Sequence, residues 1–146
     1  MPAQQFDHEK LDVYQLQLQF IGWLADLFEE LHAAKPRRVA ETLDQLDRAR
    51  LSVLLNIAEG NGRRATQQRV RFFDDARGSG AECAACLDAL VAKRATDAQR
   101  VAEGKALLIR VVSIMTKLVA VFEGKVEDGE GPGFSSRSRS RRTRTT

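Results

Sequence analysis

Two cysteines, spaced as Cys83-x-x-Cys86, are the residues whose types best suit redox or metal chemistry. In a redox-active C-x-x-C, the first cysteine lies at an exposed helix N-terminus, where the pKa of its thiol is lowered. Here the pair falls in the middle of an expected helix, with Cys83 on its apolar stripe. A zinc site needs four ligands, and the only histidines, His8 and His32, lie in or beside the first expected helix. We therefore interpret both cysteines as small buried side chains of a core or an interface, and expect no metal and no cofactor.

The remaining polar pairs do not form a catalytic constellation. Glu29-Glu30 and Asp74-Asp75 are adjacent carboxylates. Neighbours on a helix point about 100° apart, which is poor geometry for paired acid and base work. Gly60-Asn61-Gly62-Arg63 is too short for a phosphate-binding loop and follows no strand. The sequence therefore predicts a protein that is not an enzyme.

Two series of polar residues recur at helical spacing and predict a polar seam between consecutive antiparallel helices. The first comprises Arg48, Ser52, Asn56, Glu59 and Arg63, and the second Arg71, Asp75, Gly78 and Glu82. We hypothesise a network of ion pairs and hydrogen bonds, with Glu59 meeting Arg71 and Gly78 letting the backbones approach. Such a network would fix the register of the two helices and contribute little net stability.

The same region has a functional interpretation as a basic surface for RNA, formed by Arg63, Arg64, Arg69 and Arg71 together with Arg48. Charged stripes on helices are most often solvated or paired. The sequence therefore favours the structural interpretation over the functional one.

The C-terminal segment, residues 125–146, holds six basic and three acidic residues, which accounts for the whole net charge of +3. After Phe134 it contains only Ser, Arg and Thr, so it cannot bury apolar area and is predicted to be disordered. Its arginines are Arg137, Arg139, Arg141, Arg142 and Arg144. Five phosphate contacts would give a salt slope of about −4.5 on duplex or about −3.5 on single strands, without sequence specificity. The alternative is an inert solubilising tail.

Four stretches of helical periodicity must position these residues, at about 7–31, 37–59, 66–92 and 97–122. Asp7, Thr66 and Thr96 are expected as N-terminal caps, and Gly60-Asn61-Gly62 as a helix end. Short connections favour an antiparallel up-down-up-down four-helix bundle over residues 1–124. The alternative is a pair of helical hairpins that completes its core only by dimerisation.

The first helix carries more apolar surface than one bundle needs. One stripe contains Leu11, Tyr14, Leu18, Ile21, Ala25 and Phe28, and the other contains Val13, Leu16, Phe20, Trp23, Leu27 and Leu31. Together they cover about two thirds of the helix circumference, whereas packing in one bundle requires an arc of about 100°. The excess predicts that this helix also contacts another copy of the chain. A central helix buried within a single bundle is the alternative.

No basic start followed by an apolar segment marks a signal peptide, and no apolar run approaches the length of a membrane span. We therefore expect a cytoplasmic protein that does not act in a membrane.

Several of these residues lie in motifs that resemble a known family. The motifs are Asn56-Ile57-Ala58-Glu59-Gly60-Asn61-Gly62-Arg63, Arg71-Phe72-Phe73 with Ala76-Arg77-Gly78-Ser79 and Glu82, and the early Leu11-Asp12-Val13-Tyr14. They resemble the four-helix-bundle proteins named for open reading frames in intervening sequences of 23S ribosomal RNA. The resemblance covers about residues 6–122.

The resemblance implies an antiparallel four-helix bundle that assembles as a homopentameric ring, without catalytic residues. The fold is also similar to the accessory variability determinant of diversity-generating retroelements, which works with a reverse transcriptase and binds nucleic acid. Leu54 departs from the pattern, because a proline is common there, and should leave the second helix straighter. The resulting hypothesis is an oligomeric scaffold that binds RNA or DNA without sequence specificity and has a reverse transcriptase as a further partner. The alternative is a protein-interaction scaffold with no nucleic-acid role.

Overall fold

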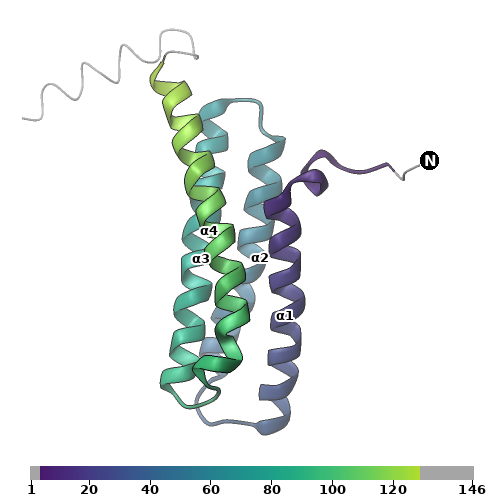
Figure 1. The fold of residues 1–146 in the computed structure, drawn as a ribbon, viewed down its shortest axis with the longest axis vertical. Coiled ribbons are helices and arrows are strands. Elements are labelled where there is room, and N and C mark those ends of the chain that lie inside the picture. The colour runs from purple at the N-terminus through teal and green to yellow at the C-terminus, as the bar shows by residue number, and fades with distance from the viewer. Residues whose placement is uncertain (1–3, 129–146) are drawn as a thin grey trace, which may run out of the picture.

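The structure is a computed structural model that describes residues 4–128. Its elements are a short 3₁₀ helix η1 (Asp7–Lys10) and four α-helices, α1 (Asp12–Ala34), α2 (Ala40–Gly62), α3 (Thr66–Ala92) and α4 (Ala98–Glu127). The helices run alternately up and down, and each packs against two neighbours: α1 on α2, α2 on α3, α3 on α4 and α4 on α1 (Figure 1). The predicted all-helical, antiparallel four-helix bundle is confirmed.

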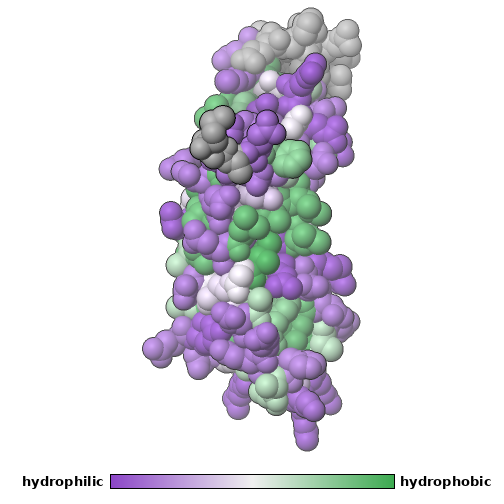
Figure 2. All heavy atoms as spheres, turned by 90° about the vertical axis from the view of Figure 1, so that its right-hand side faces the viewer, coloured by the Kyte–Doolittle hydropathy of each residue, from purple (hydrophilic) through white to green (hydrophobic). Residues whose placement is uncertain are grey.

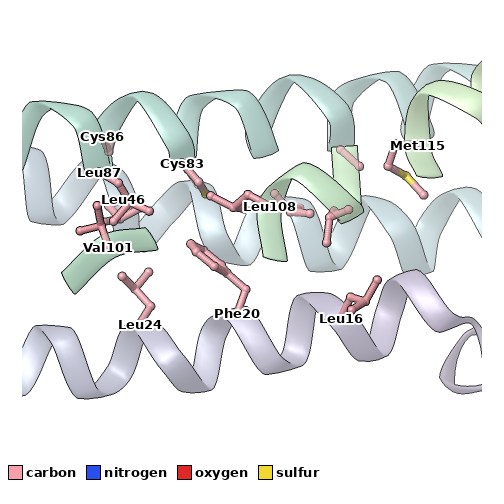
Figure 3. Close-up of a cluster of buried hydrophobic side chains, with 14 of the residues drawn as sticks. Leu16, Phe20, Leu24, Leu46, Cys83, Cys86, Leu87, Val101, Leu108 and Met115 are labelled. Carbon is pink, nitrogen blue, oxygen red and sulfur yellow. The ribbon is translucent and has the colours of Figure 1, made fainter. Parts of the chain in front are cut away.

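The core is built from one apolar stripe of each helix. Figure 3 shows Leu16, Phe20 and Leu24 of α1 facing side chains of the other three helices. The labelled partners are Leu46 of α2, Cys83, Cys86 and Leu87 of α3, and Val101, Leu108 and Met115 of α4. All of these side chains are buried. Their spacing of three and four residues places them on the inward side of each helix.

Trp23 joins α1 to α4 by lying where a side chain on Gly104 would be. A Cβ atom at Gly104 would come within 2.2 Å of the indole ring. Arg100, one turn earlier on α4, lies with its guanidinium 5.4 Å from the ring centroid, and its Nε donates to both carboxylate oxygens of Glu30 at 2.9 Å. The glycine therefore permits a close contact that no other residue would allow at this position.

The helix boundaries differ from expectation at several ends. Residues 7–10 form η1 instead of the first turn of α1, so Asp7 does not cap that helix. α2 begins at Ala40 and ends at Gly62, so Gly60-Asn61-Gly62 forms its last turn and the helix continues three residues beyond the expected Glu59. The α4 cap is Asp97, whose side chain accepts from the backbone N–H of Arg100 at 2.8 Å, in place of Thr96.

The α3 helix has the expected range. Thr66, which was expected to cap it, is instead its first helical residue, and the capping position is Ala65. The α4 helix continues to Glu127, past the point at which we expected the bundle to end. Among the described non-glycine residues, positive φ angles fall on Lys35, Arg38 and Arg94 in the connections, and neither Gly60 nor Gly62 has a left-handed φ. These two glycines are therefore part of the α2 helix.

Candidate functional site

The arginines expected to form a basic surface lie together around the α2–α3 connection. Arg63 and Arg64 follow the end of α2 and are exposed, and Arg69 and Arg71 lie in the first turns of α3. Figure 1 shows this connection at the same end of the bundle as the end of α4. The five tail arginines, Arg137, Arg139, Arg141, Arg142 and Arg144, lie outside the described residues, and in the sequence they come after α4.

Two phenylalanine rings lie beneath these cations. The guanidinium groups of Arg63 and Arg71 are 5.0 Å and 5.5 Å from the ring centroid of Phe72. The guanidinium of Arg69 is 5.5 Å from the ring centroid of Phe122. Cations over aromatic faces are held by the ring quadrupole, so these side chains are positioned over apolar surface at the end of the bundle.

Most of this positive charge is not neutralised by a carboxylate nearby. Within residues 4–128, Arg63 forms an ion pair with Glu59, with Nη2 and Oε2 2.7 Å apart. Arg69 instead donates from Nε to the backbone carbonyl of Arg63 at 2.7 Å. Over the same range, Arg64, Arg69 and Arg71 make no ion pair. Three guanidinium groups therefore keep their charge available to an anionic ligand.

The polar residues of α2 and α3 do face each other, although not in every expected pairing. Ser52 Oγ and Ser79 Oγ are 2.8 Å apart across the two helices. Asn56 Nδ2 donates to the backbone carbonyl and the hydroxyl of Ser52 at 2.9 Å and 3.1 Å. Further along, Gln45 Nε2 donates to Glu82, and Arg48 donates to Gln45 Oε1 at 2.8 Å. This polar seam links the helices by hydrogen bonds more than by ion pairs.

Two details of the seam hypothesis are wrong. Glu59 pairs with Arg63, four residues later on the same helix, and not with Arg71. Gly78 does not mediate a close approach, because nothing lies within 4 Å of a Cβ atom built on it. Gly80 instead permits a close contact between α3 and α4, since its Cβ would come within 2.9 Å of the Val112 side chain.

The family-motif glycines, Gly60 and Gly62, have different surroundings. A Cβ at Gly60 would lie 2.7 Å from the ring of Phe73 and 3.2 Å from the Cβ of Phe72. A Cβ at Gly62 would meet nothing within 4 Å. Gly60 is therefore required by helix packing, and Gly62 opens on to free space.

The cysteine pair is buried among apolar residues, as the packing interpretation expected. Cys83 is fully buried and Cys86 is 8% exposed. Burial raises the pKa of the Cys83 thiol to about 12, with further contributions from Cys86 and Glu82. Burial and Glu82 also raise the pKa of Cys86. Both effects favour the unreactive thiol over the nucleophilic thiolate. No cluster of three or more potential metal-ligating side chains occurs in residues 4–128.

We predict that neither thiol reacts with Ellman's reagent at pH 8 in the native protein, and that both react once the chain is unfolded. The reason is that the folded state raises both pKa values and excludes the reagent. Because the folded pKa of Cys83 is raised, the stability that depends on its protonation is fully present below the unfolded value of 9.0 and is lost between about pH 9 and pH 12. Rapid labelling of the native protein at pH 8 would contradict this burial.

One apolar stripe of α1 is buried in the core, and the other is partly exposed at the surface. Val13, Leu16, Phe20, Leu27 and Leu31 of one stripe are buried. The other stripe is only partly covered: Leu18 is 39% exposed. On α2, Leu51 and Leu55 are 51% and 53% exposed. Figure 2, which views the side on which α1 lies, shows hydrophobic surface along much of the length of the bundle.

A hydrogen bond aligns the exposed residues of the two helices. Gln17 Nε2 donates to the backbone carbonyl of Arg50 at 3.0 Å, which places Leu18 and Leu51 at the same level of the bundle. Gln17 is fully buried, and its Oε1 has no hydrogen-bond partner. We did not identify Gln17 from the sequence, because it directly follows Leu16 and reads there as an ordinary polar residue. We refer to Leu18, Leu51 and their partly exposed neighbour Ile21 as the α1–α2 apolar face.

The fold and the site define an all-helical protein with a hydrogen-bonded α2–α3 seam and a cluster of arginines at one end. No described helix combines the length and the hydrophobicity needed to cross a membrane. Residues 9–117 match the 23S rRNA-intervening sequence protein family, and the chain belongs to this family. No curated protein and no solved structure matches the chain.

Proposed function

We propose that the protein is a non-catalytic, oligomeric helical scaffold of the cytoplasm that binds RNA or DNA through its arginine-rich end. The observation that carries the proposal is the grouping of Arg64, Arg69 and Arg71, which form no ion pair within residues 4–128, at the end of the bundle where α4 ends and, in the sequence, the basic tail follows. Cations that track a phosphate backbone give affinity without base specificity.

Self-assembly strengthens this binding, because each additional copy brings another basic end and another tail. Linked sites raise the effective concentration for the second contact, so a weak site becomes effective in an oligomer. The α1–α2 apolar face supports assembly, because contiguous exposed apolar surface marks an interaction site. A homopentamer is the assembly that the family resemblance implies.

We predict that the apparent affinity for a single-stranded RNA falls steeply with salt. Changing the five tail arginines to glutamine should make the slope of log K against log salt less steep by about 3.5, and the corresponding change on duplex should be about 4.5. Changing Arg64 and Arg71 to glutamine should weaken binding further. Fluorescence anisotropy over a salt series measures these slopes. Absence of binding by the unmodified protein at low salt would contradict the proposal.

A second prediction concerns assembly. The native particle should have a mass that is a multiple of the 16.3 kDa chain at micromolar concentration. Leu18→Glu and Leu51→Glu should dissociate it, because a charge would be buried at the interface. Ile109→Glu is the matched control, since Ile109 on α4 is 65% exposed and lies away from α1 and α2. Analytical ultracentrifugation distinguishes these outcomes, and a monomeric unmodified protein would contradict the assembly.

The alternative function is a protein-interaction scaffold with no nucleic-acid role, and the α1–α2 apolar face favours it. A reverse transcriptase is the protein partner that the resemblance implies. Co-purification with a reverse transcriptase encoded nearby, retained after nuclease treatment, would support a direct protein contact. Loss of the partner on nuclease treatment would favour a link through nucleic acid.

A further inference from the structure

A hollow lies beside the arginine cluster, between the N-terminal segment and the last turns of α2. Its volume is about 680 Å³, and it is lined by His8, Leu55, Ala58, Glu59, Gly62 and Arg63. The N-terminal segment is fixed there, because Asn61 Nδ2 donates to Asp7 Oδ2 at 2.9 Å. Figure 1 shows η1 near the end of α2 that leads into the α2–α3 connection.

The lining combines an apolar floor, an aromatic wall and a hydrogen-bonding rim. Leu55 and Ala58 supply apolar surface, and Gly62 has no side chain to fill the space next to it. The imidazole of His8 contacts two rings: it stacks on Phe6, with centroids 5.6 Å apart and planes 11° from parallel, and its centroid is 4.7 Å from that of Tyr14. Phe6 itself is 74% exposed.

The rim offers both kinds of hydrogen-bonding group. Arg63 presents N–H donors, and Glu59 presents carboxylate acceptors, with the two held 2.7 Å apart. A phosphate in the hollow would be repelled by the Glu59 carboxylate. A neutral planar ring matches both parts of the lining: its face can contact Leu55 and Ala58, and donors and acceptors on its edge can pair with Glu59 and Arg63.

We propose that this hollow receives one unpaired nucleobase of a bound strand, whose backbone follows the neighbouring arginines. The inference rests on the proposed nucleic-acid binding and adds the form of nucleic acid that this end selects. A base within a duplex has both faces stacked and its edge paired, so it cannot enter. An unpaired base can stack on aromatic or guanidinium planes and use its free edge.

Gly62→Leu tests the hollow directly, because Gly62 lines it and a Cβ at this position meets nothing within 4 Å. Gly78→Leu is the matched control, since a Cβ there also meets nothing within 4 Å but lies on α3 away from the hollow. The probes are a 12-nucleotide single-stranded RNA with one 2-aminopurine and a blunt RNA duplex of the same length. Circular dichroism confirms that both variants are folded.

The unmodified protein should bind the single strand more tightly than the duplex and should change the emission of the 2-aminopurine. Gly62→Leu should weaken single-strand binding about tenfold, within the range for loss of one base-stacking contact, and should abolish the emission change. Duplex binding and the Gly78→Leu variant should be unaffected. His8→Ala, which removes an aromatic side chain from the lining of the hollow, should reduce the emission change independently.

The outcomes separate this inference from the proposed function. Equal binding of strand and duplex, with Gly62→Leu indistinguishable from the unmodified protein, would overturn the base-binding hollow and leave non-specific binding intact. No binding of either probe at low salt would overturn both.

Discussion

Phe20→Ala is expected to lower the free energy of unfolding by about 3–5 kcal/mol, as is typical when a buried aromatic residue is truncated. The Phe20 side chain is fully buried, and its ring points from α1 into the space between α3 and α4, near Cys83 and Leu108 (Figure 3). A loss of this size is a large share of the roughly 5–15 kcal/mol that stabilises an ordinary domain. Denaturant titration followed by far-ultraviolet circular dichroism measures it.

The matched control for that substitution is Phe6→Ala. Phe6 is 74% exposed and lies in the N-terminal segment, so the same change in side chain should alter stability by less than about 0.5 kcal/mol. If Phe20→Ala and Phe6→Ala had similar small effects, the core as described would be wrong.

The second large effect is expected at Gly60, where alanine should destabilise the bundle by about 1–3 kcal/mol through overpacking. The added Cβ would come within 2.8 Å of two Phe73 ring atoms and 3.2 Å of the Phe72 Cβ. The Phe72 Cβ is attached to the α3 backbone and cannot move without shifting that helix.

Gly62→Ala provides the comparison within the same motif. Because its Cβ would meet nothing within 4 Å, alanine should be neutral or should stabilise the helix by up to about 1 kcal/mol, through its higher helix propensity. The thermal unfolding midpoint should therefore fall for Gly60→Ala and should stay the same or rise for Gly62→Ala. A rise for both would mean that helix propensity outweighs packing on Phe73 at position 60.

Helical periodicity was sufficient to predict the number of helices and their order. The range of α3, Thr66–Ala92, could be predicted because its apolar spacing is continuous and its ends lie near polar residues. The end of α2 could not be predicted in the same way. Gly60 and Gly62 locally favour a stop, whereas the contact of Gly60 with Phe73 keeps the segment helical. Tertiary packing overrides local propensity at this position.

The candidate site was predictable where it depends on residues close in sequence. Arg63, Arg64, Arg69 and Arg71 lie within nine positions of one another, so their proximity follows from a tight connection. The position of Phe122 beneath Arg69 depends on how far α4 extends beside α3, which periodicity does not determine.

Ion-pair partners were predicted least well. The sequence offers Arg63 and Arg71 as candidate partners of Glu59, and spacing alone does not choose between them. Arg63 is one turn away on the same helix, an arrangement that requires no tertiary alignment, so it outcompetes Arg71. The α2–α3 hydrogen bond between Ser52 and Ser79 was consistent with the predicted seam, but its geometry depends on the register of the two helices.

The contact of Trp23 with Gly104 provides an intrinsic fluorescence probe of the α1–α4 packing. Trp23 is the only tryptophan in the chain, and its indole is held between Phe20 of α1 and Arg100 of α4. Its fluorescence therefore reports on the α1–α4 contact. A shift in this emission while the far-ultraviolet circular dichroism is unchanged would signify that α1 is released, or exchanged between copies, with the helices intact. This can be observed without adding a label to the protein.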